Sequence, residues 1–400
     1  MLSQFTFRNF KSYKDETILD LQAISGQEFQ DSLHYDGYRH NYLPVSVVYG
    51  PNGGGKSNVL EALASLIMVV TFPILAIRGT MNQTSIDLTP FLFDNTSKKK
   101  PTEFEIFFQP DGQFEYKYIL HLRQRKIVKE ELYRQKLVNN GRPATLFKRD
   151  EKGITLGSSI NKQSINKDVN EQMPYLSFLA ANYSIESINT AAHWFEMCVA
   201  INYAIPDSDS RILWSKDKRF KKDLISLLND TGINITGIVE TESEGHNFSV
   251  SLEHTVKNNK YLLRLDQESY GTQKLFSVLP FVMNALIEGR LLIVDELDAK
   301  LHPKLLKYII MLFKDPHINK KKAQLIFTSH DVSTMKSSVF RTDEIWFAYK
   351  KEDESSDLYS LSELRNESGN RISSHTAFDK QYLEGRYGAD PYLQHMTDWS

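Results

Sequence analysis

The sequence contains one cysteine, Cys198, among 400 residues. A single cysteine excludes a disulfide framework and any metal site built from several cysteines, and it is typical of a reducing compartment. Neither sign of charge dominates, because 48 lysines and arginines are matched by 50 aspartates and glutamates. The chain is therefore not a general polycation, and binding to nucleic acid would require a local basic patch.

Long apolar runs are missing as well. The longest, residues 63–77, is interrupted by Ser65, Thr71 and Pro73 and is too short for a membrane span. The N-terminus has no apolar signal core, and neither an internal repeat nor a sustained heptad pattern occurs. With 41% hydrophobic residues, these absences predict a folded cytoplasmic protein without a membrane segment.

Residue patterning predicts mixed helices and strands. Polar residues 139–168 are weakly patterned and predict a loop or an insertion. Alternation of Leu2, Phe5, Phe7 and Phe10 predicts N-terminal strands with one buried face. Further strands are predicted at 44–49, 102–109, 113–121, 127–137, 233–241, 248–252, 260–265, 291–294, 324–328 and 344–349, with a hairpin turn at 110–112. Helices are predicted at 57–70, 275–286 and over most of 172–230.

A glycine-rich loop separates the predicted strand at 44–49 from the helix that follows. Its sequence is Gly50-Pro51-Asn52-Gly53-Gly54-Gly55-Lys56-Ser57, which matches GxxxxGK[ST]. Glycines let backbone N–H groups wrap around a polyphosphate, and the helix start adds positive potential. The pattern predicts that Lys56 binds the β- and γ-phosphates and that Ser57 binds Mg²⁺. A chance glycine turn is the alternative, which the flanking strand and helix disfavour.

Two adjacent carboxylates, Asp295 and Glu296, end the apolar run 291–294. Because side chains alternate between the faces of a strand, the first can hold the Mg²⁺ water shell while the second polarises the attacking water. Such a pair is common by itself, and it gains meaning only from the motifs around it.

Two weaker motifs accompany these. His330 closes the strand predicted at 324–328, where it can bond to a γ-phosphate, although a buried structural histidine is the alternative. Ser269 and Gly271 precede an apolar helix and can form an anion site, although an ordinary helix cap is the simpler interpretation. Ser329, His330 and Asp331 are consecutive and lack a nucleophile elbow, so they do not form a hydrolase triad.

In this order the motifs resemble those of the ATP-binding-cassette (ABC) ATPases, in the branch of the chromosome-maintenance, RecF and OLD proteins. The resemblance identifies residues 50–57 as the Walker A loop, 269–271 as the signature, Asp295 and Glu296 as Walker B, Asp298 as part of the D-loop and His330 as the switch histidine. In this family two protomers enclose two ATP molecules, and the signature of one faces the Walker A loop of the other. Thr272 departs from the family pattern, which has a second glycine there.

The resemblance implies ATP and Mg²⁺ as cofactors. It assigns Glu296 as the base, assisted by His330 and Lys56, and it assigns Ser57 and Asp295 to Mg²⁺. The residues expected at the nucleotide are Gly50, Pro51, Asn52, Gly53, Gly54, Gly55, Lys56, Ser57, Asn58, Ser269, Gly271 and Asp298. Gln83 and Gln109 are both open as the Q-loop glutamine, and the adenine contact is unassigned.

The fold class expected from this resemblance is α/β: a P-loop ABC-type ATPase head with an N-terminal antiparallel β-subdomain and an inserted, mainly helical lobe. Residues 1–135 and 265–350 would form the two halves of the head. Residues 136–264 would form the lobe, a candidate for partner or dimer contacts, and residues 351–400 a C-terminal tail.

Two stretches near the ends of the chain make the family resemblance more specific within this branch. Residues 7–13, FRNFKSY, resemble the opening strand of RecF-like ATPases, and residues 382–391, YLEGRYGADP, resemble the ending of stand-alone phage-defence ATPases of the RloA, AbiL and AriA types. That resemblance implies a sensor or scaffold ATPase that controls a separate effector, such as a TOPRIM-type nuclease, after a phage protein or DNA acts as trigger. It also implies a homodimer or a higher even-numbered homo-oligomer.

Three other functions remain as alternatives. A RecF- or SMC-like DNA-repair ATPase usually has coiled-coil arms or a basic surface, and a transporter subunit would have a closer spacing of its motifs. A binding role without hydrolysis requires that Glu296 be misplaced. The 70 residues after His330 are too few for a nuclease domain, so we expect the effector on another chain.

Overall fold

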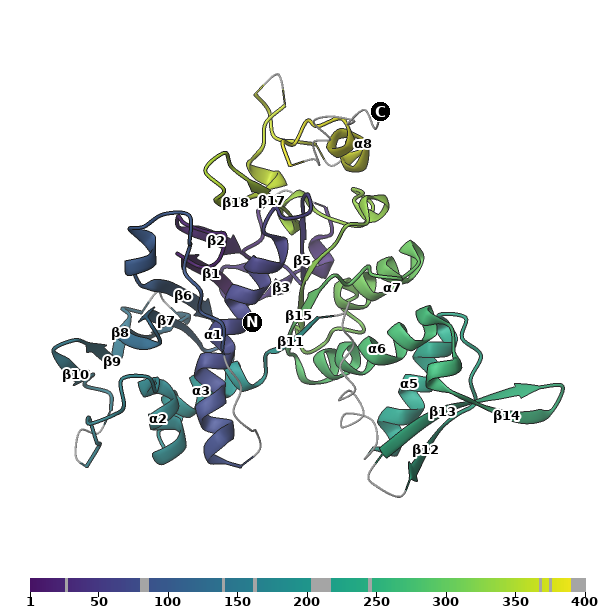
Figure 1. The fold of residues 1–400 in the computed structure, drawn as a ribbon, viewed down its shortest axis with the longest axis horizontal. Coiled ribbons are helices and arrows are strands. Elements are labelled where there is room, and N and C mark those ends of the chain that lie inside the picture. Colours follow the sequence, from purple (N-terminus) through teal and green to yellow (C-terminus); the bar gives the residue numbers. More distant parts are fainter. Residues whose placement is uncertain are drawn as a thin grey trace, which may run out of the picture.

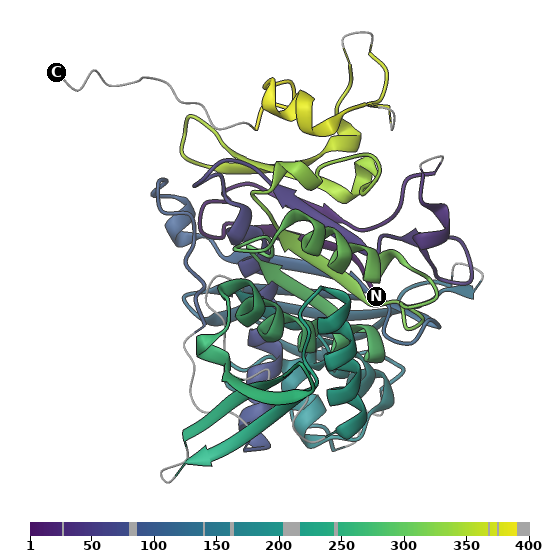
Figure 2. The same ribbon diagram turned by 90° about the vertical axis from the view of Figure 1, so that its right-hand side faces the viewer.

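The structure is a computed structural model that describes residues 1–25, 28–79, 86–138, 141–160, 164–202, 217–243, 247–366, 369–373 and 376–389. Two sheets with a long helix between them form the body of the protein (Figure 1). A three-stranded arm projects from the body, and the C-terminal segment lies at another end of the molecule (Figures 1 and 2).

The inner sheet is mostly parallel. Its strand order is β11 (Val199–Asn202), β15 (Leu291–Asp295), β16 (Gln324–Thr328), β5 (Val45–Tyr49), β17 (Ile345–Lys350) and β18 (Ser356–Ser360), and only β18 pairs antiparallel. β5 and β16 are buried at every residue, as expected for strands covered on both faces. The carboxyl ends of the parallel strands share one edge, which is where ligands bind in open α/β sheets.

The second sheet is antiparallel. Its order is β10 (Gly153–Leu156), β9 (Ala144–Asp150), β8 (Lys126–Lys136), β7 (Phe114–Arg123), β6 (Thr102–Phe108), β1 (Leu2–Arg8) and β2 (Thr17–Asp20). Along β6, buried and half-buried residues alternate, because one face packs on the core and the other meets solvent. The predicted turn at 110–112 joins β6 to β7, and Asp111 accepts hydrogen bonds from the N–H groups of Gln113 and Phe114.

Helix α1 (Lys56–Ile77) lies between the sheets. Phe5 and Phe104 of the antiparallel sheet, and Val48 and Ile326 of the parallel sheet, belong to the same core as α1. Helices α2 (Tyr175–Asn182) and α3 (Glu186–Glu196) pack against α1 and against each other. The position of α1 is therefore fixed along most of its length.

Helix α1 is longer than the predicted 57–70, and among the described residues it is long and apolar enough to cross a membrane. The argument that its apolar run is too short was wrong. Thr71 does not interrupt the helix because its hydroxyl donates to the carbonyl of Ile67. Half of the most apolar window is buried inside the protein, as in the core helix of a globular protein.

A second core lies on the other face of the parallel sheet. Helices α5 (Lys218–Asp230), α6 (Tyr270–Glu288) and α7 (Pro303–Lys314) cover this face together with the C-terminal helix α8 (Phe378–Leu383). The projecting arm consists of β12 (Gly237–Ser243), β13 (Asn247–Val256) and β14 (Asn259–Arg264). A small pair, β3 (His34–Tyr35) and β4 (Asn41–Tyr42), completes the described strands.

In the described part of residues 136–264, strands β9 to β14 alternate with helices α2, α3 and α5, so the expected mainly helical lobe is not found there. Strands β9 and β10 continue the antiparallel sheet, so the polar stretch 139–168 is not simply a loop, and the boundary expected after residue 135 falls inside β8. Strand β11, within a run expected to be helical, pairs with β15 as the edge strand of the parallel sheet. Hydrophobic pattern alone did not separate β11 from a helix, because a short apolar run fits either element.

The boundary expected after residue 350 also divides a paired unit, because β17 and β18 are antiparallel neighbours. The tail residues Tyr382 and Tyr387 are buried against Phe347 of β17, with ring centroids 5.5 and 5.4 Å away. Helix α8 is followed by Gly385 at φ 73°, which is a glycine stop. The described part of the YLEGRYGADP stretch thus packs a C-terminal unit onto the sheet, and residues 390–391 lie outside the described residues.

Candidate nucleotide-binding site

The glycine-rich loop, residues 50–57, joins β5 to α1 at the carboxyl edge of the parallel sheet. Side chains do not fit at three of its glycines. A Cβ on Gly50 would overlap the carbonyl oxygen of Ala348, one on Gly54 would lie 2.8 Å from that oxygen, and one on Gly55 would lie 2.5 Å from Ser356 Oγ. Strands β17 and β18 therefore support the underside of the loop and require glycine there.

Lys56 begins α1 and is buried, with 6% of its surface exposed. Its ammonium group donates hydrogen bonds to the carbonyl oxygens of Gly50, at 2.9 Å, and Pro51, at 3.0 Å. Burial lowers the pKa of Lys56 to about 8, and the nearby carboxylates Asp295, Asp298 and Glu296 oppose that shift. The cation is held within the loop by two backbone carbonyls, where a polyphosphate would provide a stronger partner.

Ser57 and Asp295, the two residues expected to bind Mg²⁺, lie next to each other. The Ser57 hydroxyl donates to Asp295 Oδ1 at 3.0 Å, although 238 residues separate them along the chain. Thr328, at the end of β16, also donates to Asp295 Oδ1, at 2.6 Å. A hydroxyl and a carboxylate are the oxygen ligands that Mg²⁺ accepts beside phosphates and water, so this pair fits the ion. Among the described residues, no group of three or more His, Cys, Asp or Glu side chains is placed to hold a metal ion. Mg²⁺ at this pair would therefore take its remaining ligands from phosphate and water.

Glu296 follows Asp295 in an unusual backbone conformation, with φ 52°. Its N–H donates to Thr328 Oγ1 at 2.7 Å, which holds this residue at the end of the strand. Glu296 faces a pocket of about 200 Å³. The pocket is lined by Asn52, Gly53, Gly55, Lys56, Ser57, Asn58, Glu296 and His330. Lys56, the expected magnesium ligand Ser57, the expected base Glu296 and the expected switch histidine therefore surround one cavity.

His330 is exposed, so the alternative of a buried structural histidine is wrong. The backbone N–H of His330 donates to Asp298 Oδ2 at 3.0 Å. This bond joins the segment after β16 to the turn after β15. The second oxygen, Oδ1 of Asp298, is buried and has no hydrogen-bond partner among the described residues. A ligand or another chain that reaches this turn would find an unsatisfied acceptor there.

The structure does not bring Ser269 and Gly271 into the pocket. Ser269 caps α6: its Oγ accepts a 3.2 Å hydrogen bond from the N–H of Thr272 and lies 2.9 Å from the Thr272 hydroxyl. Space around Gly271 is open, since a Cβ there would come no closer than 3.9 Å to another atom. Within one chain, the proposed signature is thus a helix cap beside the site.

Three supporting residues were not predicted. Ser12 Oγ accepts from Asn58 Nδ2 at 2.7 Å and from Ser356 Oγ at 2.8 Å, so the N-terminal segment and β18 meet at the start of α1. Thr328 is the third, through its bonds to Asp295 and Glu296. The pairing of β15 with β16 could have indicated Thr328, whereas no local pattern marks Ser12 or Ser356.

Of the two Q-loop candidates, the structure describes only Gln109. Gln109 is buried beside β6, where Nε2 donates to the hydroxyl of Tyr42 at 2.7 Å, and it does not line the cavity. Gln83 lies outside the described residues.

Comparison with known proteins identifies the family. Residues 45–336 match the family described as "AAA domain, putative AbiEii toxin, Type IV TA system". The chain belongs to this family. The match includes the glycine-rich loop, Ser269, Gly271, Asp295, Glu296 and His330, and it establishes the protein as a P-loop ATPase-domain protein with an α/β fold.

Other comparisons add little to this AAA-domain assignment. No curated protein matches the chain. Solved structures that match include the crystal structure of the SmcHead bound to the C-winged helix domain of ScpA, at 13% identity and a TM-score of 0.44, over 90% of this chain and 97% of that one. A TM-score this low carries no argument about this protein.

Proposed function

We propose that the protein is an ATP-hydrolysing switch that works as a symmetric pair and controls a separate effector in antiphage defence. The observation that carries the proposal is an incomplete site. Lys56, Ser57, Glu296 and His330 surround one pocket, whereas Ser269 and Gly271, which form a second anion-binding helix start, do not line it. A second copy of the chain would supply the missing side, as the resemblance to ABC ATPases implies.

Within this site each residue has a chemical role. Lys56 would bind the β- and γ-phosphates through its ammonium group, and the loop N–H groups would bind the remaining oxygens. Mg²⁺, held by Ser57 and Asp295, would neutralise the phosphate charge and orient the chain of phosphates. Glu296 would accept the proton of the attacking water, and His330 would donate to the γ-phosphate.

The second copy would contribute through a two-fold, isologous contact. Ser269 and Gly271 begin α6, whose N-terminus presents N–H groups and positive potential. The neighbouring Tyr270 is 71% exposed, so this helix start is open to a partner in the single chain. Asp298 lies in the turn after β15, and its Oδ1 has no hydrogen-bond partner among the described residues. This oxygen would be a further contact point for the pair.

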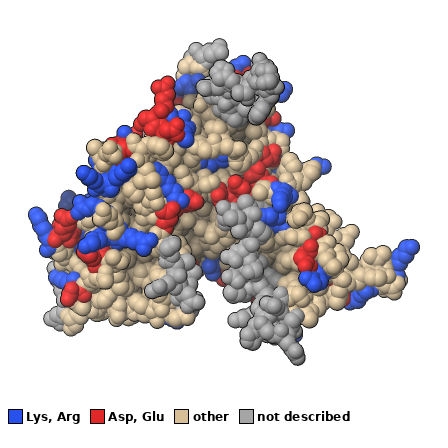
Figure 3. All heavy atoms as spheres, in the orientation of Figure 1, with Lys and Arg blue, Asp and Glu red and all other residues tan. Residues whose placement is uncertain are grey.

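The family description, which names a toxin of toxin–antitoxin systems, supports a role in defence or abortive infection. The charge distribution favours control of a protein effector rather than general DNA binding, because basic and acidic side chains are intermixed on the face in Figure 3. The effector, which the phage-defence resemblance suggests to be a TOPRIM-type nuclease, would respond to assembly of the pair in the cytoplasm. A phage protein or DNA would act as the trigger.

The direct test is the native mass of the Glu296→Gln variant with and without Mg-ATP. This change removes the base but keeps the shape of the site, so we expect ATP to bind, hydrolysis to fall at least about a hundredfold and the pair to accumulate. A single copy under both conditions, measured where ATP binding is confirmed, would contradict the pairing. A variant that hydrolyses ATP as fast as the wild type would contradict the assignment of Glu296.

Mixing two inactive variants tests whether the site is shared. Lys56→Ala removes the phosphate contact, and Gly271→Asp places a carboxylate where the partner's phosphate is expected. If each site combines two chains, a mixture regains about a quarter of the wild-type rate through random pairing in a two-fold dimer. No recovery, with both variants folded and paired, would indicate that each chain forms its own site.

Control of an effector is tested separately. A tagged chain, wild type or Glu296→Gln, is purified from cells that express its native genetic neighbours. A partner retained by one nucleotide state and released by the other would support the switch. The absence of any stoichiometric partner in both states would contradict effector control while leaving the ATPase assignment intact.

A further inference from the structure

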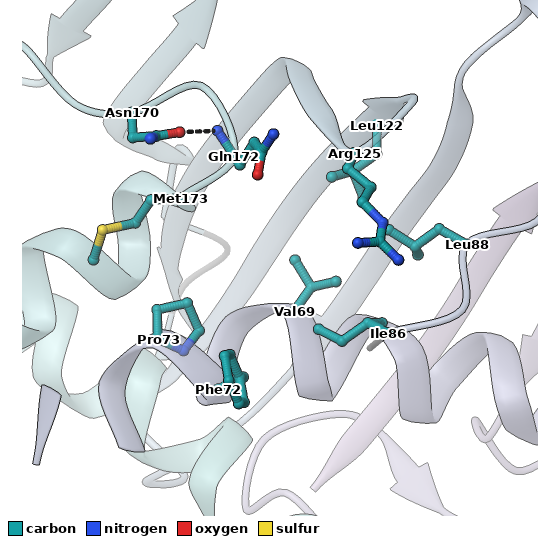
Figure 4. A pocket seen from close by; sticks show the side chains of 10 residues that line it. All are labelled: Val69, Phe72, Pro73, Ile86, Leu88, Leu122, Arg125, Asn170, Gln172 and Met173. Carbon is teal, nitrogen blue, oxygen red and sulfur yellow. Dashed lines mark hydrogen bonds between the residues drawn. The ribbon is translucent and has the colours of Figure 1, made fainter. Parts of the chain in front are cut away.

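A second pocket, of about 400 Å³, opens on the side of α1 away from the phosphate loop. Its floor is Val69, Phe72 and Pro73 of α1, and Leu88 and Leu122 form apolar walls (Figure 4). Val69 is 13 positions after Lys56, which corresponds to about 20 Å along a helix. The volume lies in the range of small-molecule sites, and the lining is mostly apolar.

One cation, Arg125, reaches over this apolar surface. Figure 4 shows its guanidinium group directed toward Val69, beside Leu88. Among the described residues, Arg125 has neither an ion pair nor a hydrogen bond, unlike Arg123 and Lys126 on either side of the same turn. Arg123 pairs with Glu151 at 2.8 Å, and Lys126 pairs with Glu171 at 2.6 Å.

The hairpin turn gives no local reason for arginine at this position. Gln124 and Arg125 have φ values of 50° and 68°, the conformation of a two-residue turn that favours asparagine and glycine. An arginine in this conformation costs about 1–2 kcal/mol relative to a relaxed residue. Despite this conformational cost, Arg125 occupies the turn, and its unpaired guanidinium lies at the mouth of an apolar pocket.

We propose that this pocket binds a small amphipathic acid, an aliphatic or aromatic carboxylate. Its apolar body packs on Val69, Phe72, Leu88 and Leu122, and its carboxylate pairs with Arg125. Apolar area supplies affinity, and the charge-assisted hydrogen bonds of the guanidinium select an anion. Asn170 and Gln172, at the opposite rim in Figure 4, leave the mouth polar. The site is distinct from the nucleotide pocket and shares only α1 with it.

The test is calorimetric titration of the intact protein with decanoate, below its micelle concentration, and with decanol as the neutral probe. We expect one decanoate to bind per chain. Arg125→Gln should weaken decanoate by about tenfold or more while leaving decanol unchanged. Arg123→Gln, on the same hairpin but paired outside the pocket, is the matched control and should change neither.

Leu88→Trp fills the pocket and should abolish binding of both probes. Met173→Trp, from the facing wall, replaces it if Leu88→Trp does not fold, and circular dichroism with thermal unfolding verifies the fold of each variant. Absence of saturable decanoate binding to the wild type, equal weakening by Arg123→Gln, or binding that persists in the filled pocket would overturn the proposal. Because no hydrolysis or pairing is measured, these outcomes are independent of the proposed ATPase function.

Discussion

The hydroxyl of Thr328 donates a 2.6 Å hydrogen bond to Asp295 Oδ1, and the same hydroxyl accepts a 2.7 Å bond from the N–H of Glu296. Val294 pairs with Phe327 in adjacent parallel strands, so the next residues, Asp295 and Thr328, end side by side. Thr328 is fully buried. One hydroxyl thus positions both the expected metal ligand and the backbone of the expected base.

Replacing Thr328 by valine keeps its shape and removes both hydrogen bonds. Mutation of a residue that hydrogen-bonds to a metal ligand typically lowers metal affinity or activity by about 10–100-fold. We therefore expect the valine variant to need more Mg²⁺ and to hydrolyse ATP about 10–100-fold more slowly. Titration of ATPase activity with Mg²⁺ measures both. Thr328→Ser keeps the hydroxyl and should restore most of the activity. If serine and valine are equally impaired, Thr328 acts through packing alone.

The phosphate loop should tolerate a side chain at one glycine and not at another. Gly50 has φ 147° and meets the backbone of Ala348, which cannot move without disturbing β17, so Gly50→Ala should abolish nucleotide binding. Gly53 has φ 75° and open space around it, so Gly53→Asn should bind within about tenfold of the wild type, since asparagine accepts this conformation. Fluorescent ATP binding distinguishes the two, and equal loss in both would contradict the steric argument.

Nucleotide binding should take up a proton at alkaline pH. Burial lowers the pKa of Lys56 to about 8 in the free protein, so its amine is mostly neutral above that pH. A bound phosphate favours the ammonium form and raises the pKa, so affinity should fall as pH rises above about 8 and stay level below it.

Calorimetry with a non-hydrolysable ATP analogue, in buffers of different ionisation enthalpy, measures this uptake. A proton should be absorbed at about pH 9 but much less at about pH 7. Lys56→Arg stays charged throughout and should remove the difference. The same uptake in Lys56→Arg would assign the proton to another group.

Asn9, in the motif that resembles RecF-like ATPases, should act on stability. Its buried Nδ2 donates to the carbonyls of Ser97, Lys100 and Pro101, and its Oδ1 accepts from Phe91 N–H. Asn9→Ala leaves these groups unsatisfied and should lower the free energy of unfolding by roughly 2–4 kcal/mol. Denaturant unfolding measures this, with exposed Asn95→Ala as a control near zero. A normal stability for Asn9→Ala would contradict the anchoring role.

Sequence patterns predicted the site better than the fold around it. The loop, Asp295, Glu296 and His330 are short motifs whose chemistry fixes both residue type and neighbouring element. Loop residues, Glu296 and His330 line one pocket, and Asp295 hydrogen-bonds to Ser57 at its edge. The mainly helical lobe expected at 136–264 was wrong in the described part of that range, because β9 and β10 extend the antiparallel sheet as hairpins with β8, and β11 pairs with the distant strand β15. Ser12 and Ser356 escaped prediction for the same reason, since 344 residues separate two side chains that hydrogen-bond.

The sequence by itself determined a P-loop, two carboxylates after a buried strand, and an α/β chain with balanced charge. Those features are local, because a strand, a glycine turn and a helix start suffice to present phosphate-binding groups. Tertiary structure alone decided that Ser57 lies against Asp295, that Thr328 joins Asp295 to Glu296, and that Ser269 is left outside the pocket. These relationships depend on which strands become neighbours, and that choice comes from packing α1 between two sheets rather than from any single segment.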